Sequence, residues 1–476
     1  MRSRAQTVVP IVVACAFFME NFDGTVIATA LPAIARSLHS EPVSLSIAMT
    51  AYLVSLAVFI PVSGWLADRY GTSTTFRAAI VVFTLASVFC GLATSLPQLV
   101  VARVVQGMGG AMMLPVGRLI ILRSFDRSQF VQAMSYVTTP ALIGPVFGPP
   151  VGGFLTTYLS WRWIFFINVP IGILGIVLAT MWVKNTQREA ARPFDVLGFA
   201  LTGIGVAALM GALDVLVRDA GAVLAAALLV VGVAFACAAI VHARRFPWPL
   251  IDLSLFRLQP FASSMGPGCV FRAVAFALPF LLPLLFQIGF GITAFVSGLM
   301  TCSAAGGALM MKAWAPRILR CYGFRAVLAT NGVLTGSCAM AIAAFDTATA
   351  VVIIVLIVLA VLAFGFGRSL QLSALNAFTF AGVPTEQMSA ATSLSGMLQQ
   401  LAAATGIGAS ALLLRGAVAF RGAPIGTLDA LDIRRTIAVT ALVSIAAGIA
   451  FLRLDRESGV DISGHRRIPA GGEGSA

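Results

Sequence analysis

The sequence predicts an all-α integral membrane protein with fourteen transmembrane helices. Of its 476 residues, 59% are hydrophobic and only 10% are charged, and the mean hydropathy is +0.97. Soluble domains carry about 25% charged residues, so this chain has too little polar surface to cover a water-facing globule. The apolar residues also form runs of membrane-spanning length, and the basic residues collect in alternate connectors. These observations argue against a soluble multidomain protein.

Each expected helix is an apolar run between charged or turn-forming clusters. A helix that crosses ~30 Å of hydrocarbon needs about 20 residues. The expected spans are 8–30, 45–67, 78–96, 98–120, 132–158, 163–183, 195–213, 221–241, 261–286, 293–313, 326–345, 348–371, 389–414 and 434–453. No connector exceeds about 20 residues, which leaves no room for a soluble catalytic domain.

The basic residues predict the orientation of the chain. With the N-terminus inside, 21 of the 31 Lys and Arg residues fall on the inner side, seven fall on the outer side, and Arg103, Arg272 and Arg368 lie within spans. The positive-inside rule then places both termini in the cytoplasm, as an even number of spans requires, in the inner (plasma) membrane. The net charge of +13 is thus a signal of topology, and no nucleic-acid partner is expected.

The two ends of the chain are expected to differ. Glu20, Asn21 and Asp23 interrupt the first apolar run, which continues to Leu31 without a convincing small-x-small cleavage site, so an uncleaved first helix is expected rather than a signal peptide. The tail 454–476 is polar and rich in Gly, and no structure is expected there.

The sequence shows no constellation of catalytic or metal-binding residues. It has three histidines, no nucleotide-binding loop and no ATP-binding domain. The seven cysteines lie in or beside apolar runs, without a CxxC pair or a histidine at ligand spacing, so they are interpreted as small apolar side chains. No enzyme activity, metal or bound cofactor is expected, and the energy for any transport would come from an ion gradient.

Three ionisable residues are expected inside the membrane on the first and fourth helices. A charge near the bilayer centre costs at least ~2.5–3.5 kcal/mol, so each indicates a water-lined cavity or a partner. Asp23 and Arg103 are both expected ~10 Å below the outer surface, and they can pair if the two helices are neighbours. Glu20 lies three residues earlier, on roughly the same face and ~4–5 Å deeper. Carboxylates beside an arginine can bind and release protons, because burial and neighbouring charges alter the stability of the ionised form. The alternative is a static bridge between Asp23 and Arg103, with Glu20 reaching the membrane surface or facing water.

The other two intramembrane arginines lie in the second half. Arg272 lies about eleven residues into its helix, without an acidic partner evident in the sequence. Three roles stay open for it: contact with an anionic substrate, pairing with a carboxylate of the first half, or a purely structural one. Arg368 lies near the inner end of its helix and is expected to reach the membrane surface or to bind a helix end.

A short inner connector carries the first motif, Gly64-Trp-Leu-Ala-Asp-Arg-Tyr-Gly71. Gly64 would allow close helix approach, Gly71 a left-handed turn, and Asp68, beside Arg69, could cap a neighbouring helix. The motif resembles the loop between helices two and three of the major facilitator superfamily. Unlike the usual family pattern, which places basic residues directly after the second Gly, three hydroxyl residues follow Gly71, and the next cation is Arg77.

Two further motifs lie within expected helices. Arg103-Val-Val-Gln-Gly-Met-Gly-Gly-Ala111, which contains Gln106 and Gly107, is similar to the family's stretch on its proton-linked fourth helix. Gly144-Pro-Val-Phe-Gly-Pro-Pro-Val-Gly-Gly153 resembles the Gly-Pro signature of antiporters, with Pro145, Gly148, Pro149 and Gly152 in its pattern. Repeated glycines let helices touch backbone to backbone and prolines bend the span, which suits a rocking interface. A merely kinked packing helix is the alternative.

Two signatures narrow the resemblance to one subfamily. Asp23-Gly-Thr-Val-Ile-Ala-Thr-Ala-Leu-Pro32 and Ser160-Trp-Arg-Trp-Ile-Phe-Phe-Ile-Asn-Val-Pro-Ile-Gly172 resemble those of the fourteen-spanner drug:proton antiporters of the EmrB/QacA type. The resemblance implies a six-helix bundle over 1–183, two extra helices with linkers over 184–258, a second six-helix bundle over 259–453 and a cytoplasmic tail over 454–476. An echo of Arg69-Tyr-Gly71 at Cys321-Tyr-Gly323, each followed by Phe-Arg, supports two related halves.

The resemblance implies proton-coupled export of small amphipathic or cationic organic compounds, that is, multidrug efflux. Asp23 is the first choice for proton coupling, with Glu20 and Arg103 adjusting it. Two alternatives stay open: a transporter of a specific metabolite such as an organic anion, anchored by Arg272, and a transporter-like receptor that moves nothing. The expected partners are the substrate, protons and membrane lipid. Export past a second membrane would also require a periplasmic adaptor and an outer-membrane channel.

Overall fold

The chain folds into a bundle of long helices in the computed structural model, which describes residues 2–125, 127–183, 193–348, 350–384, 387–424 and 427–454. The helices are α1 (Arg2–Ser37), α2 (Ser46–Tyr70), α3 (Thr72–Leu92), α4 (Leu96–Ser124), α5 (Arg127–Tyr158), α6 (Trp163–Phe166), α7 (Asn168–Trp182), α8 (Val196–Arg218), α9 (Ala222–Arg245), η1 (Leu253–Arg257), α10 (Gln259–Met265), α11 (Pro267–Leu284), the π-helical turn η2 (Leu285–Gly289), α12 (Ala294–Ala344), α13 (Val351–Thr379), α14 (Met388–Phe420), α15 (Ala430–Ala450) and η4 (Phe451–Arg453). Beyond Leu454, the expected tail lies outside the described residues.

Twelve helices of the described chain are long and apolar enough to cross a membrane, against the fourteen expected. Two helices account for the difference. The expected spans 293–313 and 326–345 both fall within α12, which is interrupted at Gly323, where φ is 72° and ψ is 169°. The expected span 132–158 falls within α5, which is not among the twelve.

Side chains at several helix starts satisfy the free backbone N–H groups there. Asp429 and Asp432 form a capping box at the start of α15, and the side chain of Thr293 accepts from Val296 N at the start of α12. Asp195 accepts from Gly198 N at the start of α8. Such caps define the ends of apolar helices whose interiors contain few polar residues.

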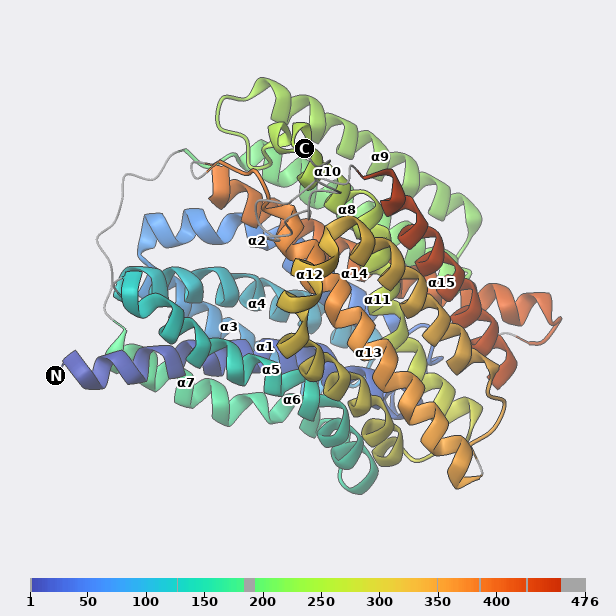
Figure 1. Cartoon of the computed structure of the whole chain (residues 1–476). Coiled ribbons are helices and arrows are strands. Elements are labelled where there is room, and N and C mark those ends of the chain that lie inside the picture. Colours follow the sequence, from blue (N-terminus) through green and yellow to red (C-terminus); the bar gives the residue numbers. More distant parts are fainter. Residues whose placement is uncertain are drawn as a thin grey trace, which may run out of the picture.

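Two groups of helices lie side by side (Figure 1): α1–α7, blue to teal, and α10–α15, which end in red. The helices α8 and α9, in green, pack against each other at the edge of the bundle, and α8 also packs against α2 and α14. The face at which α1 begins is called the N-terminal face, and the face at which it ends is called the opposite face.

The buried apolar core shows where the two groups join. A cluster towards the opposite face contains residues from both groups, including Phe22, Leu31, Leu281 and Phe286. Towards the N-terminal face the core divides, because one cluster contains residues of the first group alone and another contains residues of the second group alone. The Gln287 side chain also donates to Thr29 O at 2.9 Å across the join. The two groups are thus packed together at the opposite face.

Candidate functional site

A buried ion pair links α1 to α4. Asp23 is 0% exposed and Arg103 is 1% exposed. Arg103 Nη1 donates to Asp23 Oδ2 at 2.5 Å and to Gln106 Oε1 at 2.6 Å, and Gln106 Nε2 donates to Asp23 Oδ1 at 2.9 Å. The expected contact between Asp23 and Arg103 is therefore present, and Gln106, one helical turn from Arg103, closes a three-membered network.

Two more helices contribute to this network. Asn168, at the start of α7, donates to Asp23 Oδ1 at 3.3 Å. Ser87 of α3 accepts a hydrogen bond from Gln106 Nε2 at 2.8 Å. Asn168 lies inside the signature 160–172, which is the signal that could have identified it, whereas the sequence offers no such signal for Ser87. The carboxylate of Asp23 thus accepts hydrogen bonds from side chains of α4 and α7.

The Arg103 guanidinium has further partners on α2. Its Nε donates to Ala48 O at 3.1 Å, and its guanidinium carbon lies 4.2 Å from the centre of the Tyr52 ring. Removing one partner of a buried ion pair costs about 3–5 kcal/mol, because the other charge is left without compensation. Protonation of Asp23 would therefore weaken a set of contacts that involves α2, α3, α4 and α7.

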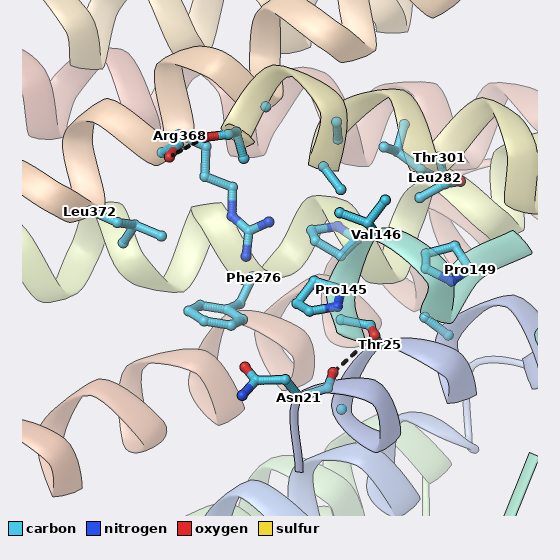
Figure 2. A pocket seen from close by; sticks show the side chains of 18 of the residues that line it. Asn21, Thr25, Pro145, Val146, Pro149, Phe276, Leu282, Thr301, Arg368 and Leu372 are labelled. Atoms are coloured by element: carbon cyan, nitrogen blue, oxygen red, sulfur yellow. Dashed lines mark hydrogen bonds between the residues drawn. The ribbon is translucent and has the colours of Figure 1, made fainter. Parts of the chain in front are cut away.

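A central cavity of about 560 Å³ lies between the two groups of helices. Residues of α1, α2, α4 and α5 line one side, and residues of α11, α12, α13 and α14 line the other. Figure 2 shows Asn21 of α1 and Pro145 of α5 facing Phe276 of α11 and Arg368 of α13 across this space. A cavity of this size is typical of sites for small organic ligands.

The two carboxylates of α1 have different surroundings. Asp23 is fully buried and is not among the residues that line the cavity, whereas Glu20 and Arg103 do line it. Glu20 Oε2 is buried without a hydrogen-bond partner, and Arg118 of α4 acts on Glu20 electrostatically. The expected stripe of two carboxylates thus consists of one paired group inside the first bundle and one group that faces the cavity.

Arg272 lies outside the cavity lining and packs among α10, α11 and α13. Its Nη1 donates to Ser264 O at 3.0 Å, and its Nη2 donates to Asn376 Oδ1 at 2.9 Å. The helix breaks at Gly266, where φ is −89° and ψ is −98°, so the Ser264 carbonyl lies at the end of α10. Of the three roles left open for Arg272, these contacts favour the structural one.

Arg368 lines the cavity, and the prediction that it reaches the membrane surface or a helix end is wrong. Its guanidinium carbon lies 5.1 Å from the centre of the Phe276 ring, and its Nε is buried without a hydrogen-bond partner. Figure 2 shows the side chain pointing from α13 towards Phe276. The sequence carries a signal for this position, because Arg368-Ser-Leu-Gln371 repeats the spacing of Arg103-Val-Val-Gln106.

The glycines of α5 allow close contact with α1. At Gly144 a Cβ atom would lie 3.0 Å from Phe22 N, and at Gly152 it would lie 2.9 Å from Val26 O. Gly148, between them, faces Thr25. Gly153 instead faces Ala294 of α12, in the other group. Larger side chains would separate these backbones, so the motif forms the close packing that its spacing predicts. Pro145 and Pro149 of the same motif line the cavity.

The turn between α2 and α3 differs in part from its expected geometry. Gly71 has φ 89°, a conformation that favours glycine, but a Cβ at Gly64 would meet nothing within 4 Å, so no close helix approach occurs there. Asp68 does not cap α3; its carboxylate accepts from Arg123 Nη2 of α4 at 3.3 Å. Arg69 is exposed. On α4, Gly107 allows contact with Tyr52 O.

Within the described residues, no three His, Cys, Asp or Glu side chains lie close enough together to hold a metal ion.

Known proteins resemble this chain over most of its length. The sequence matches the Major Facilitator Superfamily over residues 13–407. It is 37% identical over 407 residues to a protein of Escherichia coli O139:H28 named "Putative multidrug resistance protein MdtD", with 85% of each chain covered. It is also 37% identical over 404 residues to the protein of the same name from Enterobacter sp. (strain 638), again with 85% of each covered.

Solved structures share the fold at low sequence identity. A POT family transporter in complex with 5-aminolevulinic acid matches with a TM-score of 0.71 and 13% identity, covering 94% of this chain and 95% of the other. A bacterial homologue of the human lysosomal transporter Spinster, in an inward-facing and unoccupied conformation, matches with a TM-score of 0.63 and 15% identity, covering 96% and 98%. At these identities the likeness concerns the fold alone.

Proposed function

Because the chain belongs to the major facilitator superfamily, a family of transporters rather than enzymes, we propose that it is a proton-coupled antiporter that exports small amphipathic organic compounds by alternating access. The name of its relatives, multidrug resistance protein, supports export of such compounds. One observation carries the proposal. A buried network of Asp23, Arg103 and Gln106 lies directly beside a central cavity that Arg103 and Glu20 help to line.

Asp23 is the proposed site of proton coupling. Without a proton, its carboxylate balances Arg103 and holds together side chains of α1, α4 and α7. With a proton, the negative charge is lost, and the buried guanidinium no longer has its counter-ion. Because the network touches several helices of the first bundle, protonation would favour a different packing of this bundle. Glu20, which faces the cavity, is the proposed second carboxylate of the pathway.

The proposed topology has fourteen spans. Dividing α12 at Gly323 and including α5 adds two spans to the twelve candidates. The hairpin of α8 and α9 would then be the extra pair between two bundles of six, in accordance with its position at the edge (Figure 1). The excess of basic residues in alternate connectors supports a cytoplasmic N-terminal face, in the inner membrane, with both termini on that side.

In this orientation, the proposed conformation is inward-facing. The core that joins the two groups lies towards the opposite, outer face, and the two separate cores lie towards the cytoplasm. Within the first bundle, Gly148 would keep α5 in close contact with α1, and at Gly153 α5 would provide the surface on which the second bundle rocks, through its contact with Ala294 of α12. Export past a second membrane would require a periplasmic adaptor and an outer-membrane channel as partners.

A proton-flux measurement tests this proposal. The protein is reconstituted in liposomes that contain a pH dye, and a panel of lipophilic compounds of different charge is added. We expect compound-driven proton movement by the wild type and none by Asp23→Asn. Asp219→Asn is the matched control, because Asp219 is 70% exposed at the end of α8 and has a positive φ that Asn also adopts readily. Equal proton movement by the wild type and Asp23→Asn would rule out Asp23 as the coupling site.

A further inference from the structure

The charges that line the central cavity do not balance. The lining contains one acidic residue, Glu20, and three basic residues, Arg103, Lys312 and Arg368. Arg103 is paired with Asp23, and Glu20 already interacts with Arg118. Within the described part of the chain, neither Lys312 nor Arg368 has an acidic partner. The second side of the cavity is therefore positive, and nothing in the described structure compensates it.

Arg368 is the more enclosed of these two cations. Its side chain is half-buried, whereas Lys312 is exposed. Its Nε is buried without a hydrogen-bond acceptor, and among the described residues its only charge-related contact is with the face of the Phe276 ring, at 5.1 Å. A guanidinium taken out of water loses hydrogen bonds, and this loss is costly unless an acceptor replaces the water. The group is thus placed to receive an acceptor from a bound molecule.

We propose that Arg368 binds an acidic group of the exported compound, and that the substrates are amphipathic organic acids. This inference rests on the proposed function, because it takes the central cavity to be the transport site. A guanidinium presents two parallel N–H donors, which match the two oxygens of a carboxylate. The apolar body of the compound would lie beside Phe276 and against the prolines of α5, Pro145 and Pro149, which face the same space (Figure 2).

The position of Glu20 is consistent with an acidic rather than a cationic substrate. A lipophilic cation would need a free carboxylate in the cavity, and among the described lining residues Glu20 is the only carboxylate. Its charge is already opposed by Arg118, and Arg103 is also present in the lining on the same side of the cavity. A cation bound there would meet more positive than negative charge. An acid bound at Arg368 would instead be attracted by both Arg368 and Lys312.

Three fluorescent probes with the same aromatic body separate these possibilities. Dansylglycine carries a carboxylate, its carboxamide is neutral, and dansylethylenediamine carries an ammonium group at neutral pH. Binding of each is measured by fluorescence with the full-length protein in lipid nanodiscs. Charge-assisted hydrogen bonds to a guanidinium favour the carboxylate over the carboxamide by roughly 10- to 100-fold in affinity. We expect this order in the wild type, with the ammonium probe weakest.

Variants of Arg368 test whether this residue causes the preference for the carboxylate. We expect Arg368→Gln to lose the preference for the carboxylate and to bind the carboxamide as the wild type does, which also shows that the variant is folded. Arg368→Lys should keep part of the preference, because it retains the charge but not the planar pair of donors. Arg317→Gln is the matched control, because it removes an exposed arginine of α12 that is not part of the cavity lining. It should bind all three probes as the wild type does.

The outcomes separate this inference from the proposed function. Equal affinity for the carboxylate and the carboxamide, or an unchanged preference in Arg368→Gln, overturns the role of Arg368. If only the ammonium probe drives proton movement in liposomes, proton-coupled export stands and the acidic substrate class is overturned. If the carboxylate binds through Arg368 but no probe moves protons, the acidic site stands and proton-coupled export is overturned.

Discussion

The two halves of the molecule place an arginine and a glutamine at the same spacing but in opposite electrostatic situations. On α4, Arg103 is 1% exposed and donates to Asp23 at 2.5 Å, with Gln106 bridging the pair. On α13, Arg368 faces the cavity without an acidic partner in the described chain, and Gln371 turns away to Asn331, from which it accepts a hydrogen bond at 2.9 Å. One pattern thus supports a neutralised pair in the first half and an uncompensated cation in the second.

The difference arises from the neighbouring helix and not from the pattern itself. In the first half, α1 provides Asp23 to Arg103, whereas in the second half α11 offers the ring of Phe276 to Arg368. An aromatic face attracts a cation by about 0.5–2 kcal/mol, which does not replace a counter-ion. In the proposed mechanism the first half would therefore hold a proton within a closed network, and the second half would present its charge to a ligand.

The largest expected effect is on stability, where removing Arg103 and removing Arg368 should have opposite consequences. Arg103→Gln leaves Asp23 buried without its cation, so we expect the free energy of unfolding to fall by about 3–5 kcal/mol. Arg368→Gln removes a charge that has no partner, so we expect stability in the absence of ligand to stay the same or to increase. The measurement is thermal unfolding of the purified variants in one detergent.

A double variant checks the origin of the first effect. Asp23→Asn combined with Arg103→Gln removes both charges, so it should recover part of the stability lost in Arg103→Gln. If Arg368→Gln were as destabilising as Arg103→Gln, the two arginines would have equivalent structural roles, and the contrast between the halves would be wrong.

The two glutamines should differ in function more than in stability. Gln106→Leu removes the amide that donates to Asp23 and Ser87. Gln371→Leu removes the amide that donates to Leu328 O and accepts a hydrogen bond from Asn331. Each change leaves buried polar atoms unsatisfied, so we expect a loss of about 1–3 kcal/mol in both. Only Gln106→Leu should shift the pH dependence of proton movement in liposomes, since only Gln106 contacts the proposed proton site. An equal shift in Gln371→Leu would contradict this assignment.

The contact between Asp23 and Arg103 could be predicted because it depends on how far each residue lies below the outer membrane surface. Both residues lie at similar distances from the outer ends of the spans expected from the sequence, 8–30 and 98–120, and the cost of burying a charge demands a partner. The close backbone packing at Gly144, Gly148 and Gly152 could also be predicted, since glycines four residues apart lie on one face of a helix, whereas their partner α1 could not.

The roles of the second-half arginines could not be predicted in the same way. The spans around Arg272 and Arg368 are so apolar that hydropathy does not show which side of each helix faces the cavity. For Arg272 the deciding feature is a backbone break at Gly266, which places the Ser264 carbonyl within reach. For Arg368 it is the rotation of α13 about its axis. Both depend on tertiary packing that a pattern of residue types does not encode.

A third carboxylate, directly before the span Val196–Arg218 that α8 forms in the structure, provides the smallest expected effect. Asp195 is 5% exposed at the start of α8, where it accepts from Gly198 N at 2.8 Å and from Leu250 N at 3.1 Å and pairs with His242 Nε2 at 2.7 Å. Burial favours the neutral acid, but these hydrogen bonds and the His242 interaction outweigh burial and hold the pKa of Asp195 below its usual value. Like Asp23, it is a buried carboxylate with several donors, but its main partners are backbone groups and not an arginine.

The low pKa fixes the direction of the pH effect on Asp195→Asn. Because the folded protein binds the proton less readily than the unfolded chain does, the ionised Asp195 stabilises the fold above about pH 4, its unperturbed range. This contribution is lost as the pH falls through the lowered value. Because Asn lacks the charge that strengthens these hydrogen bonds, we expect Asp195→Asn to cost about 1 kcal/mol at pH 7, and the difference from the wild type to shrink as the pH falls below about 4. Thermal unfolding at pH 7 and below about pH 4 measures this difference, with Asp252→Asn as the matched control, because Asp252 is a half-buried cap of η1 whose hydrogen bond from Ser254 N is exposed. A difference that grew towards low pH would show that the acid form of Asp195, and not its carboxylate, stabilises the start of α8. Hydrogen bonds to a buried carboxylate would then not favour its ionised form, at Asp195 or at Asp23.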